Sequence, residues 1–248
     1  MKLLVDVGNS RIKWGCLIDG TLEAGFPVER EEPLDDALRA AWSALRAPSA
    51  ALICSVAGDS FDARMAQWIL ENWGFRPEWL RSGPEALGIV NGYADYAQLG
   101  NDRWAAMLGA RSFSPGPFGV IDAGTAVTVD VVDGDGRHLG GLILPGLTLM
   151  QRSLLTGTAR IREAAPVPRV VLGHSTAECV ASGTGFGLAG ALERCVAEVE
   201  RLRAGIAWIA TGGSWPQLGP MIARPVRHDA ELVLRGLARM SQRKEEAH

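Results

Sequence analysis

The sequence lacks several features that would place it at once in a functional class. Its 25 basic and 28 acidic residues leave a formal net charge of −3, so no basic surface for nucleic acid or an anionic membrane is indicated. It has only 4 His and 4 Cys, and no two cysteines stand in a C-x-x-C motif, so we expect neither a zinc site nor a disulfide framework. No run approaches the roughly 18 apolar residues of a membrane-spanning helix. We therefore expect a cytoplasmic protein with no nucleic-acid or membrane partner.

What the chain does have is enough apolar material for a large core. Of its 248 residues, 47% are hydrophobic and 21% are charged, and 30 are glycine. This composition excludes intrinsic disorder and a small disulfide-stapled module. The length allows one large domain or two of moderate size.

An internal repeat is the most informative pattern. Residues 3–25 and 119–141 each contain a short apolar strand that ends in aspartate, then D-x-G-[NT], a second strand and an Asp-Gly hairpin turn. One constant shift, without a gap, places Asp6 on Asp122 and Gly8 on Gly124. A chance resemblance between two hairpins would not hold both the acidic strand end and the turn in one register. The repeat therefore predicts two duplicated halves.

Each repeated hairpin is followed by helices and further strands. Apolar residues spaced by three and four predict helices over residues 34–45 and 65–73. Ser175 and Glu178 form a capping-box pattern that opens a helix toward residue 195. Buried strands are expected at residues 51–56 and 205–210, and the join between the halves at 114–117. We expect an α/β protein of two domains, 1–114 and 115–248, with a cleft between them.

The repeated D-x-G-[NT] motif suits phosphate binding. A glycine just after a strand end lets backbone N–H groups approach an anion closely, while Asn9, Ser10, Thr125 and Thr128 add neutral donors. The aspartates repel phosphate, so their sensible task is to hold a cation that bridges to it. Thr211-Gly212-Gly213 offers a third surface for close approach, suited to a nucleoside. Two such loops facing each other would clamp a nucleoside triphosphate.

Other phosphate motifs are missing or misplaced. The sequence has no G-x-x-x-x-G-K-[ST], which removes a P-loop. A G-x-G-x-x-G string at residues 185–190 falls within the predicted helix after Ser175 rather than at a strand end, so close helix packing explains it better than a dinucleotide site.

Two residues keep two interpretations each. Lys13 would contact a phosphate or be a solvated strand residue, and Asp102 would cap a helix or accept a hydroxyl proton in phosphoryl transfer.

The motifs together resemble the type III pantothenate kinase family. They occur in the family's order over nearly the whole chain, and their combination is specific, although D-x-G-[NT] alone marks the wider acetate and sugar kinase/Hsp70/actin superfamily. The matching residues are Asp6-x-Gly8-Asn9-Ser10-x-x-Lys13-Trp14, Gly100-x-Asp102-Arg103-Trp104, Ile121-Asp122-x-Gly124-Thr125-Ala126 and Gly140-Gly141-x-Ile143-x-Pro145-Gly146. The resemblance implies two ribonuclease-H-like domains of the actin-like ATPase fold, a homodimer, and ATP-dependent phosphorylation of pantothenate to 4'-phosphopantothenate, the first step of coenzyme A synthesis.

The resemblance also implies a role for each matching residue. Asp102 would be the general base, Asp122 would hold a monovalent cation (K+ or NH4+), and Asp6 would position the Mg2+ that accompanies ATP. The residues that would bind ATP are Asp6, Val7, Gly8, Asn9, Ser10, Arg11, Ile12, Lys13 and Thr125. Those that would bind pantothenate are Tyr93, Gly100, Asn101, Asp102, Arg103 and Thr176.

One departure and one alternative remain. Asn101 stands where the family usually has a small or apolar residue, and the sequence does not show what its side chain does. The family is also similar to Bvg accessory factor, a proposed transcriptional regulator, which would bind nucleotide without turnover. The presence of Asp102, the acidic isoelectric point and the lack of a helix-turn-helix pattern weigh against that alternative.

Overall fold

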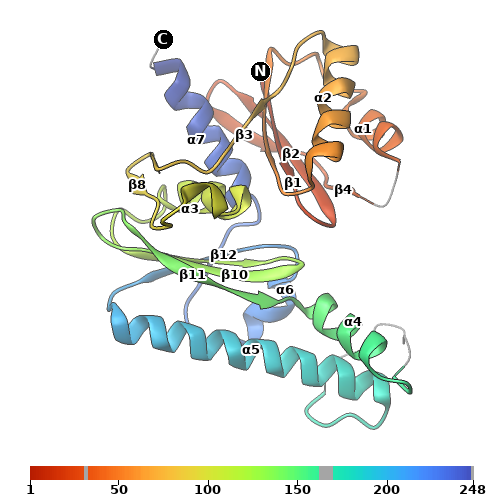
Figure 1. Ribbon diagram of the computed structural model, residues 1–248, viewed down its shortest axis with the longest axis vertical. Coiled ribbons are helices and arrows are strands. Elements are labelled where there is room, and N and C mark those ends of the chain that lie inside the picture. The colour runs from red at the N-terminus through yellow and green to blue at the C-terminus, as the bar shows by residue number, and fades with distance from the viewer. Residues whose placement is uncertain (31–32, 162–169, 247–248) are drawn as a thin grey trace. The chain divides into compact units, whose positions relative to one another are not determined.

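The computed structural model describes residues 1–30, 33–161 and 170–246, which form two compact units. The first unit contains Met1–Gly116, Val132–Gly140 and the segment from Glu231 onward. The second contains Pro117–Val131 and Gly141–Ala230. Figure 1 shows the elements of both units, each of which is built on its own sheet.

The sheet of the first unit has the strand order β3-β2-β1-β5-β6, with β4 paired to β2. β1 is antiparallel to β2 and parallel to β5. The strands are β1 (Lys2–Val7), β2 (Arg11–Ile18), β3 (Thr21–Ala24), β4 (Val28–Glu29), β5 (Ala50–Ser55) and β6 (Glu78–Trp79). The short hairpin of β7 (Glu85–Ala86) and β8 (Ile89–Val90) is separate from it.

The two faces of this sheet are covered by different helices. One face packs Leu3, Val5 and Val7 against α1 (Leu34–Trp42) and α2 (Asp59–Trp73). Because side chains alternate along a strand, Lys2, Leu4 and Asp6 point to the other face. There the Nζ of Lys2 donates a hydrogen bond to Ser241 Oγ of α7 (Leu232–Glu246) at 3.1 Å. α7 packs in turn on α3 (Asn101–Ala110), which follows the short 3₁₀ helix η1 (Tyr96–Gln98).

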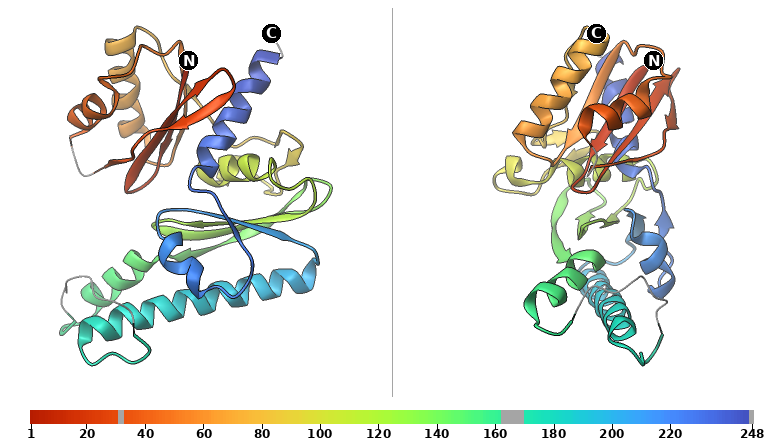
Figure 2. Two further views of the ribbon diagram at one scale, coloured as in Figure 1. Left: turned by 180° about the vertical axis from the view of Figure 1, so that it is seen from behind. Right: turned by 90° about the vertical axis from the view of Figure 1, so that its right-hand side faces the viewer.

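The sheet of the second unit has the order β11-β10-β9-β12-β13. Its core joins Ile121, Ala123 and Val127 to Leu188 and Leu192 of the long helix α5, which runs along the sheet in Figure 2. The strands are β9 (Phe118–Ala123), β10 (Ala126–Val132), β11 (His138–Pro145), β12 (Ala207–Thr211) and β13 (Arg227–His228). The helices are α4 (Leu147–Gly157), α5 (Thr176–Leu202), α6 (Trp215–Leu218) and the 3₁₀ helix η2 (Gly219–Met221).

The two strand orders confirm the internal duplication. β3-β2-β1-β5-β6 and β11-β10-β9-β12-β13 follow the same path, and the third pairing is parallel in both, β1 with β5 and β9 with β12. The expected register without a gap is wrong in detail. Residues 8–10 separate β1 from β2, whereas only 124–125 separate β9 from β10. The longer turn at residues 133–137 restores the alignment, so the second phosphate loop is one residue shorter than the first.

The local predictions agree well with the elements. The helix expected at 34–45 corresponds to α1, which ends earlier, and the helix expected at 65–73 is the C-terminal part of α2. The strands expected at 51–56 and 205–210 correspond to β5 and β12. The capping box is formed: Ser175 Oγ accepts from Glu178 N at 3.2 Å, and the Glu178 carboxylate accepts from Ser175 N at 3.1 Å. The G-x-G-x-x-G string lies inside α5, as its helical context predicts.

The compact units differ from the expected domains 1–114 and 115–248 at the C-terminus. The first boundary falls between Gly116 and Pro117, next to the expected join, but α7 belongs to the first unit. The reason is its apolar stripe, in which Leu232, Leu234 and Leu237 are fully buried. Arg239 Nη1 also donates to the Leu108 carbonyl of α3 at 2.6 Å.

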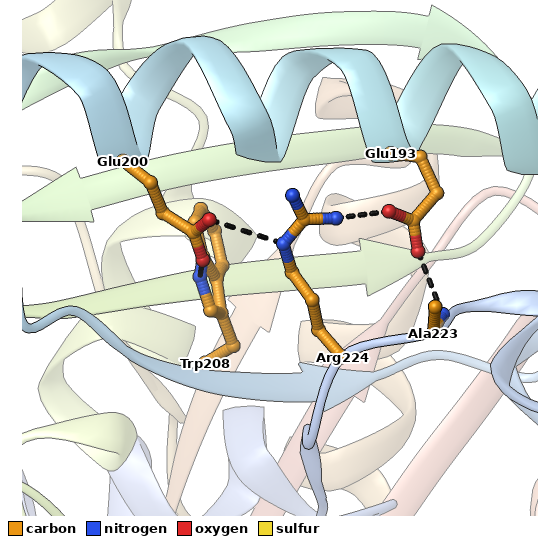
Figure 3. A network of polar contacts seen from close by, with 5 residues as sticks. All are labelled: Glu193, Glu200, Trp208, Ala223 and Arg224. Atoms are coloured by element: carbon orange, nitrogen blue, oxygen red, sulfur yellow. Dashed lines mark hydrogen bonds and ion pairs between the residues drawn. The ribbon is translucent and has the colours of Figure 1, made fainter.

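A network of charged groups holds α5 to the segment before β13 (Figure 3). The Arg224 guanidinium contacts Glu193 and, through Nε at 3.1 Å, Glu200. Glu200 also accepts from Trp208 Nε1 of β12 at 3.0 Å, and Glu193 accepts from the Ala223 N–H at 2.7 Å. The hydrogen bond to Glu200 is the main reason that the pKa of Arg224 is raised.

Among the described residues, no helix is long and apolar enough to cross a membrane.

Candidate active site

The first phosphate loop is the turn between β1 and β2. Gly8 N donates to the Arg11 carbonyl at 3.0 Å, which closes the turn and leaves Asn9 and Ser10 exposed. Arg30 Nη1 donates to the carbonyl oxygens of Gly8 at 2.8 Å and Asn9 at 3.1 Å. Its guanidinium lies 4.6 Å from the ring centroid of Phe61. Arg30 thus engages two carbonyls that would repel phosphate and adds positive charge beside the loop, a role that the sequence analysis missed.

Asp6 lies in the middle of a row of three side chains across the sheet. It is directly opposite Lys13 on β2 and beside Cys54 on β5. Directly opposite residues share a face, so the carboxylate and the ammonium groups leave the sheet on the same side. Lys13 is half-buried, and it is therefore not a fully solvated strand residue. Asp6 therefore points to the face of the sheet that α3 and α7 cover.

Asp102 is in the first turn of α3, but it is not the N-cap. Gly100 holds that position without a side-chain cap, so the expectation of an Asp102 cap is wrong. Asp102 Oδ1 instead accepts a hydrogen bond from Arg103 N at 2.8 Å, which satisfies one N–H group of the first turn.

Asp6 and Asp102 both lie near the end of β5: Asp6 is paired with Cys54, and Asn101, the neighbour of Asp102, donates a hydrogen bond to the Ser55 carbonyl. The Cys54 side chain is fully buried, and its pKa is raised well above the ordinary value, first by desolvation and then by the negative charges of Asp6 and Asp102. Asp62 adds a smaller effect of the same sign, and Arg81 opposes it. The carboxylate expected to position Mg2+ and the expected general base are therefore both near the end of β5. The structure brings together the phosphate-loop aspartate and the candidate base.

Arg103 and Tyr93 form a second pair of predicted site residues in direct contact. Arg103 Nη1 donates to the Tyr93 hydroxyl at 2.9 Å, and Arg103 is only 6% exposed. The Tyr93 ring is stacked on His138, with centroids 5.8 Å apart and planes 13° from parallel. Gly92 permits this packing, because a Cβ there would lie 1.9 Å from the His138 carbonyl oxygen. No sequence pattern indicates His138, which is distant from Tyr93 in the chain.

Asp122 occupies the position in the second unit that Asp6 occupies in the first. It is the penultimate residue of β9 and is paired with Thr211 of β12. Gly212 has φ +94°, and a Cβ there would lie 2.5 Å from Asp122 Oδ1 and 2.4 Å from the Ala123 carbonyl carbon. Only glycine therefore fits next to this carboxylate. Thr211-Gly212-Gly213 was expected to permit close approach, and this turn lies against Asp122.

The Asp122 loop presents oxygen atoms. A Cβ on Gly146 would lie 2.4 Å from the Thr125 carbonyl oxygen and 2.5 Å from that of Gly124, while Gly146 N donates to Thr125 at 3.0 Å. Carboxylate and carbonyl oxygens are the ligands of hard cations. The Asp122 carboxylate and the carbonyl groups of its loop are donors of the type that the monovalent cation implied by the resemblance would take. Within the described ranges, no group of three or more His, Cys, Asp or Glu side chains could hold a metal ion.

Thr176 lines a cavity of about 800 Å³ in the second unit, between α4 and the start of α5. The walls are mainly apolar, with Met150, Leu154 and Val180 among them, and His174 and Ser175 contribute polar groups. Thr176 is the first residue of α5, so the capping box at Ser175 fixes its position. Its expected role in substrate binding is not tested by this geometry.

The duplicated sheets and the paired aspartate loops define an α/β protein of the actin-like ATPase and sugar kinase fold. A protein named as a Baf family transcriptional activator from Campylobacter jejuni superposes with a TM-score of 0.63 at 21% identity, covering 98% of this chain and 99% of that one. A 2-dehydro-3-deoxygalactonokinase, so named, from Sinorhizobium meliloti superposes with a TM-score of 0.56 at 15% identity over 98% and 99% of the two chains. Identities this low show the fold alone.

The sequence comparisons are more specific. The family model for type III pantothenate kinase matches residues 2–198. A type III pantothenate kinase from Leptothrix cholodnii is 38% identical over 259 aligned positions, which cover 96% of this chain and 95% of the relative. The chain belongs to the type III pantothenate kinase family.

Proposed function

We propose that the chain transfers the γ-phosphoryl group of ATP to the primary hydroxyl of pantothenate, the first step of coenzyme A synthesis. Family membership supports the reaction. The structural observation that supports it best is that Asp6 and the start of α3, which carries Asp102, both lie near the end of β5, since phosphoryl transfer needs a cation-positioning carboxylate and a base at one site.

Asp102 is the proposed general base. The attacking hydroxyl must lose its proton as the new P–O bond forms, and a positioned carboxylate can accept it. The hydrogen bond from Arg103 N orients the Asp102 carboxylate. Gly100, Asn101 and Arg103 would surround the substrate near Asp102, and the Tyr93 hydroxyl, held by Arg103, would complete this part of the pocket.

The phosphates of ATP are assigned to the two loops. Asp6, Val7, Gly8, Asn9, Ser10, Arg11, Ile12 and Lys13 supply the first, and Thr125 belongs to the second. Mg2+ supplies charge neutralisation at the phosphates when bound, with Asp6 as the nearby carboxylate. Asp122, with the Gly124 and Thr125 carbonyls, would hold K+ or NH4+, and that charge would offset the repulsion between Asp122 and ATP.

A second copy of the chain is part of the proposal. β11 is an edge strand of its sheet, and its Ile143 side chain is 65% exposed, with Leu142 also exposed. An apolar edge strand is a template for association. Together with the family resemblance, this supports a homodimer, which light scattering on the purified protein tests directly.

The reaction is tested by ADP release coupled to pantothenate addition. We expect turnover only when ATP, Mg2+ and pantothenate are all present, and higher turnover in potassium than in sodium. Sugars offered in place of pantothenate should give none. Nucleotide binding without turnover, combined with DNA binding, would instead favour an accessory factor of the Bvg type.

A further inference from the structure

Asn101 is the residue of the Gly100–Arg103 motif that the family resemblance leaves unexplained. The structure shows that both ends of its side-chain amide are used inside the first unit. Asn101 Oδ1 accepts a hydrogen bond from Ser82 N at 2.9 Å, and Asn101 Nδ2 donates to the Ser55 carbonyl at 3.3 Å. Amide O and N positions are assigned from such a network, and these two partners fix the assignment.

The partners of Asn101 are themselves held in place. Ser82 is 7% exposed, and its Oγ donates to the Leu99 carbonyl at 2.8 Å, immediately before α3. Ser55 is 4% exposed, and its Oγ donates to Asp62 Oδ1 of α2 at 2.5 Å. Ala57 N donates to the same Ser55 oxygen at 3.2 Å. The network therefore joins the carboxyl end of β5, the start of α2 and the start of α3.

This connection spans the two catalytic elements of the first unit. Ser55 follows Cys54, which lies beside Asp6 in the parallel pairing of β5 with β1. Asn101 precedes Asp102. The hydrogen bond from Asn101 to Ser55 therefore sets the position of Asp102 relative to Asp6, which lies on the strand next to β5. Gly100, the N-cap residue of α3, has no side chain. The N-cap position therefore adds no side-chain hydrogen bond to the one that Asn101 makes with Ser55.

We infer that Asn101 is a positioning residue: through its hydrogen bonds to Ser82 and Ser55 it fixes the N-terminus of α3, and with it Asp102, against the end of β5. The inference rests on the proposed function only for its effect on turnover. In this role the Asn101 side-chain amide faces the network, so any contact of Asn101 with pantothenate would be made by its backbone. A small residue at this position would remove the hydrogen bonds to Ser82 N and to the Ser55 carbonyl, which would then bond to other groups or to water.

The test compares Asn101→Ala and Ser82→Ala with the matched control Asn72→Ala. Asn72 Nδ2 also donates to a backbone carbonyl, that of Trp68 at 2.8 Å, but within α2 alone. A small displacement of a catalytic group costs up to roughly 100-fold in rate. We expect Asn101→Ala to lower kcat roughly 10- to 100-fold with the KM values of ATP and pantothenate within about twofold of the parent. Ser82→Ala should shift kcat in the same direction by less, because Ser82 N remains, and Asn72→Ala should leave kcat unchanged.

Hydrogen exchange gives a readout that does not depend on turnover. Amides of the first turn of α3 should exchange faster in Asn101→Ala than in the parent, while those of α2 stay unchanged. A raised KM for pantothenate at unchanged kcat would assign the side chain to substrate and overturn the inference. The inference would also be overturned if Asn101→Ala exchanged these amides at the parent's rate. It would likewise be overturned if the parent were active and Asn101→Ala had the same kcat. If the parent itself shows no pantothenate-dependent ADP release, the proposed function fails while the exchange experiment still decides whether Asn101 anchors α3.

Discussion

Asp6 of β1 and Cys54 of β5 are direct neighbours in a parallel pairing, and the buried thiol is affected by the charges of both Asp6 and Asp102. This relationship places the end of the phosphate-loop strand next to the start of α3. The carboxylate proposed to position a cation and the carboxylate proposed to accept a proton therefore both lie near the end of β5. The first unit alone would then supply two of the groups that phosphoryl transfer requires.

Asp102→Asn tests the base. Asparagine keeps the shape and still offers an oxygen to Arg103 N, but it cannot accept the hydroxyl proton. We expect kcat to fall by roughly 10²- to 10⁴-fold, the usual contribution of general base catalysis, with the circular dichroism spectrum unchanged. Asp95→Asn is the control, because the Asp95 side chain caps η1 through Ala97 N, as asparagine also would. Near-normal turnover of Asp102→Asn would show that Asp102 only orders the first turn of α3.

Asp6→Ala tests the first phosphate loop. Loss of the carboxylate removes the group proposed to hold the Mg2+ of ATP, so we expect no turnover at any Mg2+ concentration. Asp36→Ala, an exposed change on α1, should behave like the parent. Full rescue of Asp6→Ala by excess Mg2+ would reduce Asp6 to an aid to affinity.

The sequence predicted the parts of the fold that depend on local pattern. Apolar spacing located α1 and α2, the Ser175–Glu178 pair located the start of α5, and the D-x-G repeat predicted the two equivalent sheets. The placement of α7 depends instead on which distant surface buries its apolar stripe, and only the packing on α3 and β1 decides that. The one-residue difference between the phosphate loops was also hidden, because a longer hairpin turn compensates for it.

The site shows the same division. Asp6 and Asp102 could be proposed as site residues from their types and positions in the sequence, and Arg103 from the family resemblance. Arg30 and His138 could not, because each acts through tertiary contacts, Arg30 on the Gly8 carbonyl and His138 on the Tyr93 ring. Their sequence neighbourhoods give no sign of these contacts.

Burial of Cys54 predicts a pH effect on stability. Desolvation, then Asp6 and Asp102, raise the pKa of this thiol in the folded protein, so the folded state keeps its proton at a pH where the unfolded chain loses it. The contribution is complete below about pH 8.5, the pKa of an exposed thiol, and declines as the pH rises above it. The free energy of unfolding, measured in urea from pH 7 to 10, should therefore fall less steeply for Cys54→Ala than for the parent. Cys179→Ala changes an exposed thiol and should keep the parent slope; equal slopes for the parent and Cys54→Ala would contradict the assignment.

The last prediction separates the two copies of the aspartate loop. Asp6 and Asp122 are equivalent in the duplicated sheets, but the Mg2+ of one ATP needs only one of them, which leaves the Asp122 carboxylate for another cation. The carboxylate of Asp122 and the carbonyl oxygens of Gly124 and Thr125 are of the type that a large monovalent ion takes as ligands, without the strict octahedral geometry of Mg2+. We expect low activity in sodium buffer and restoration by potassium or ammonium. Asp122→Asn should lose this activation while its dependence on Mg2+ changes little, and Asp135→Asn, in the exposed hairpin of the same sheet, should retain it. Equal activity of the unmodified protein in sodium and in potassium would show that Asp122 merely lies near the end of β9.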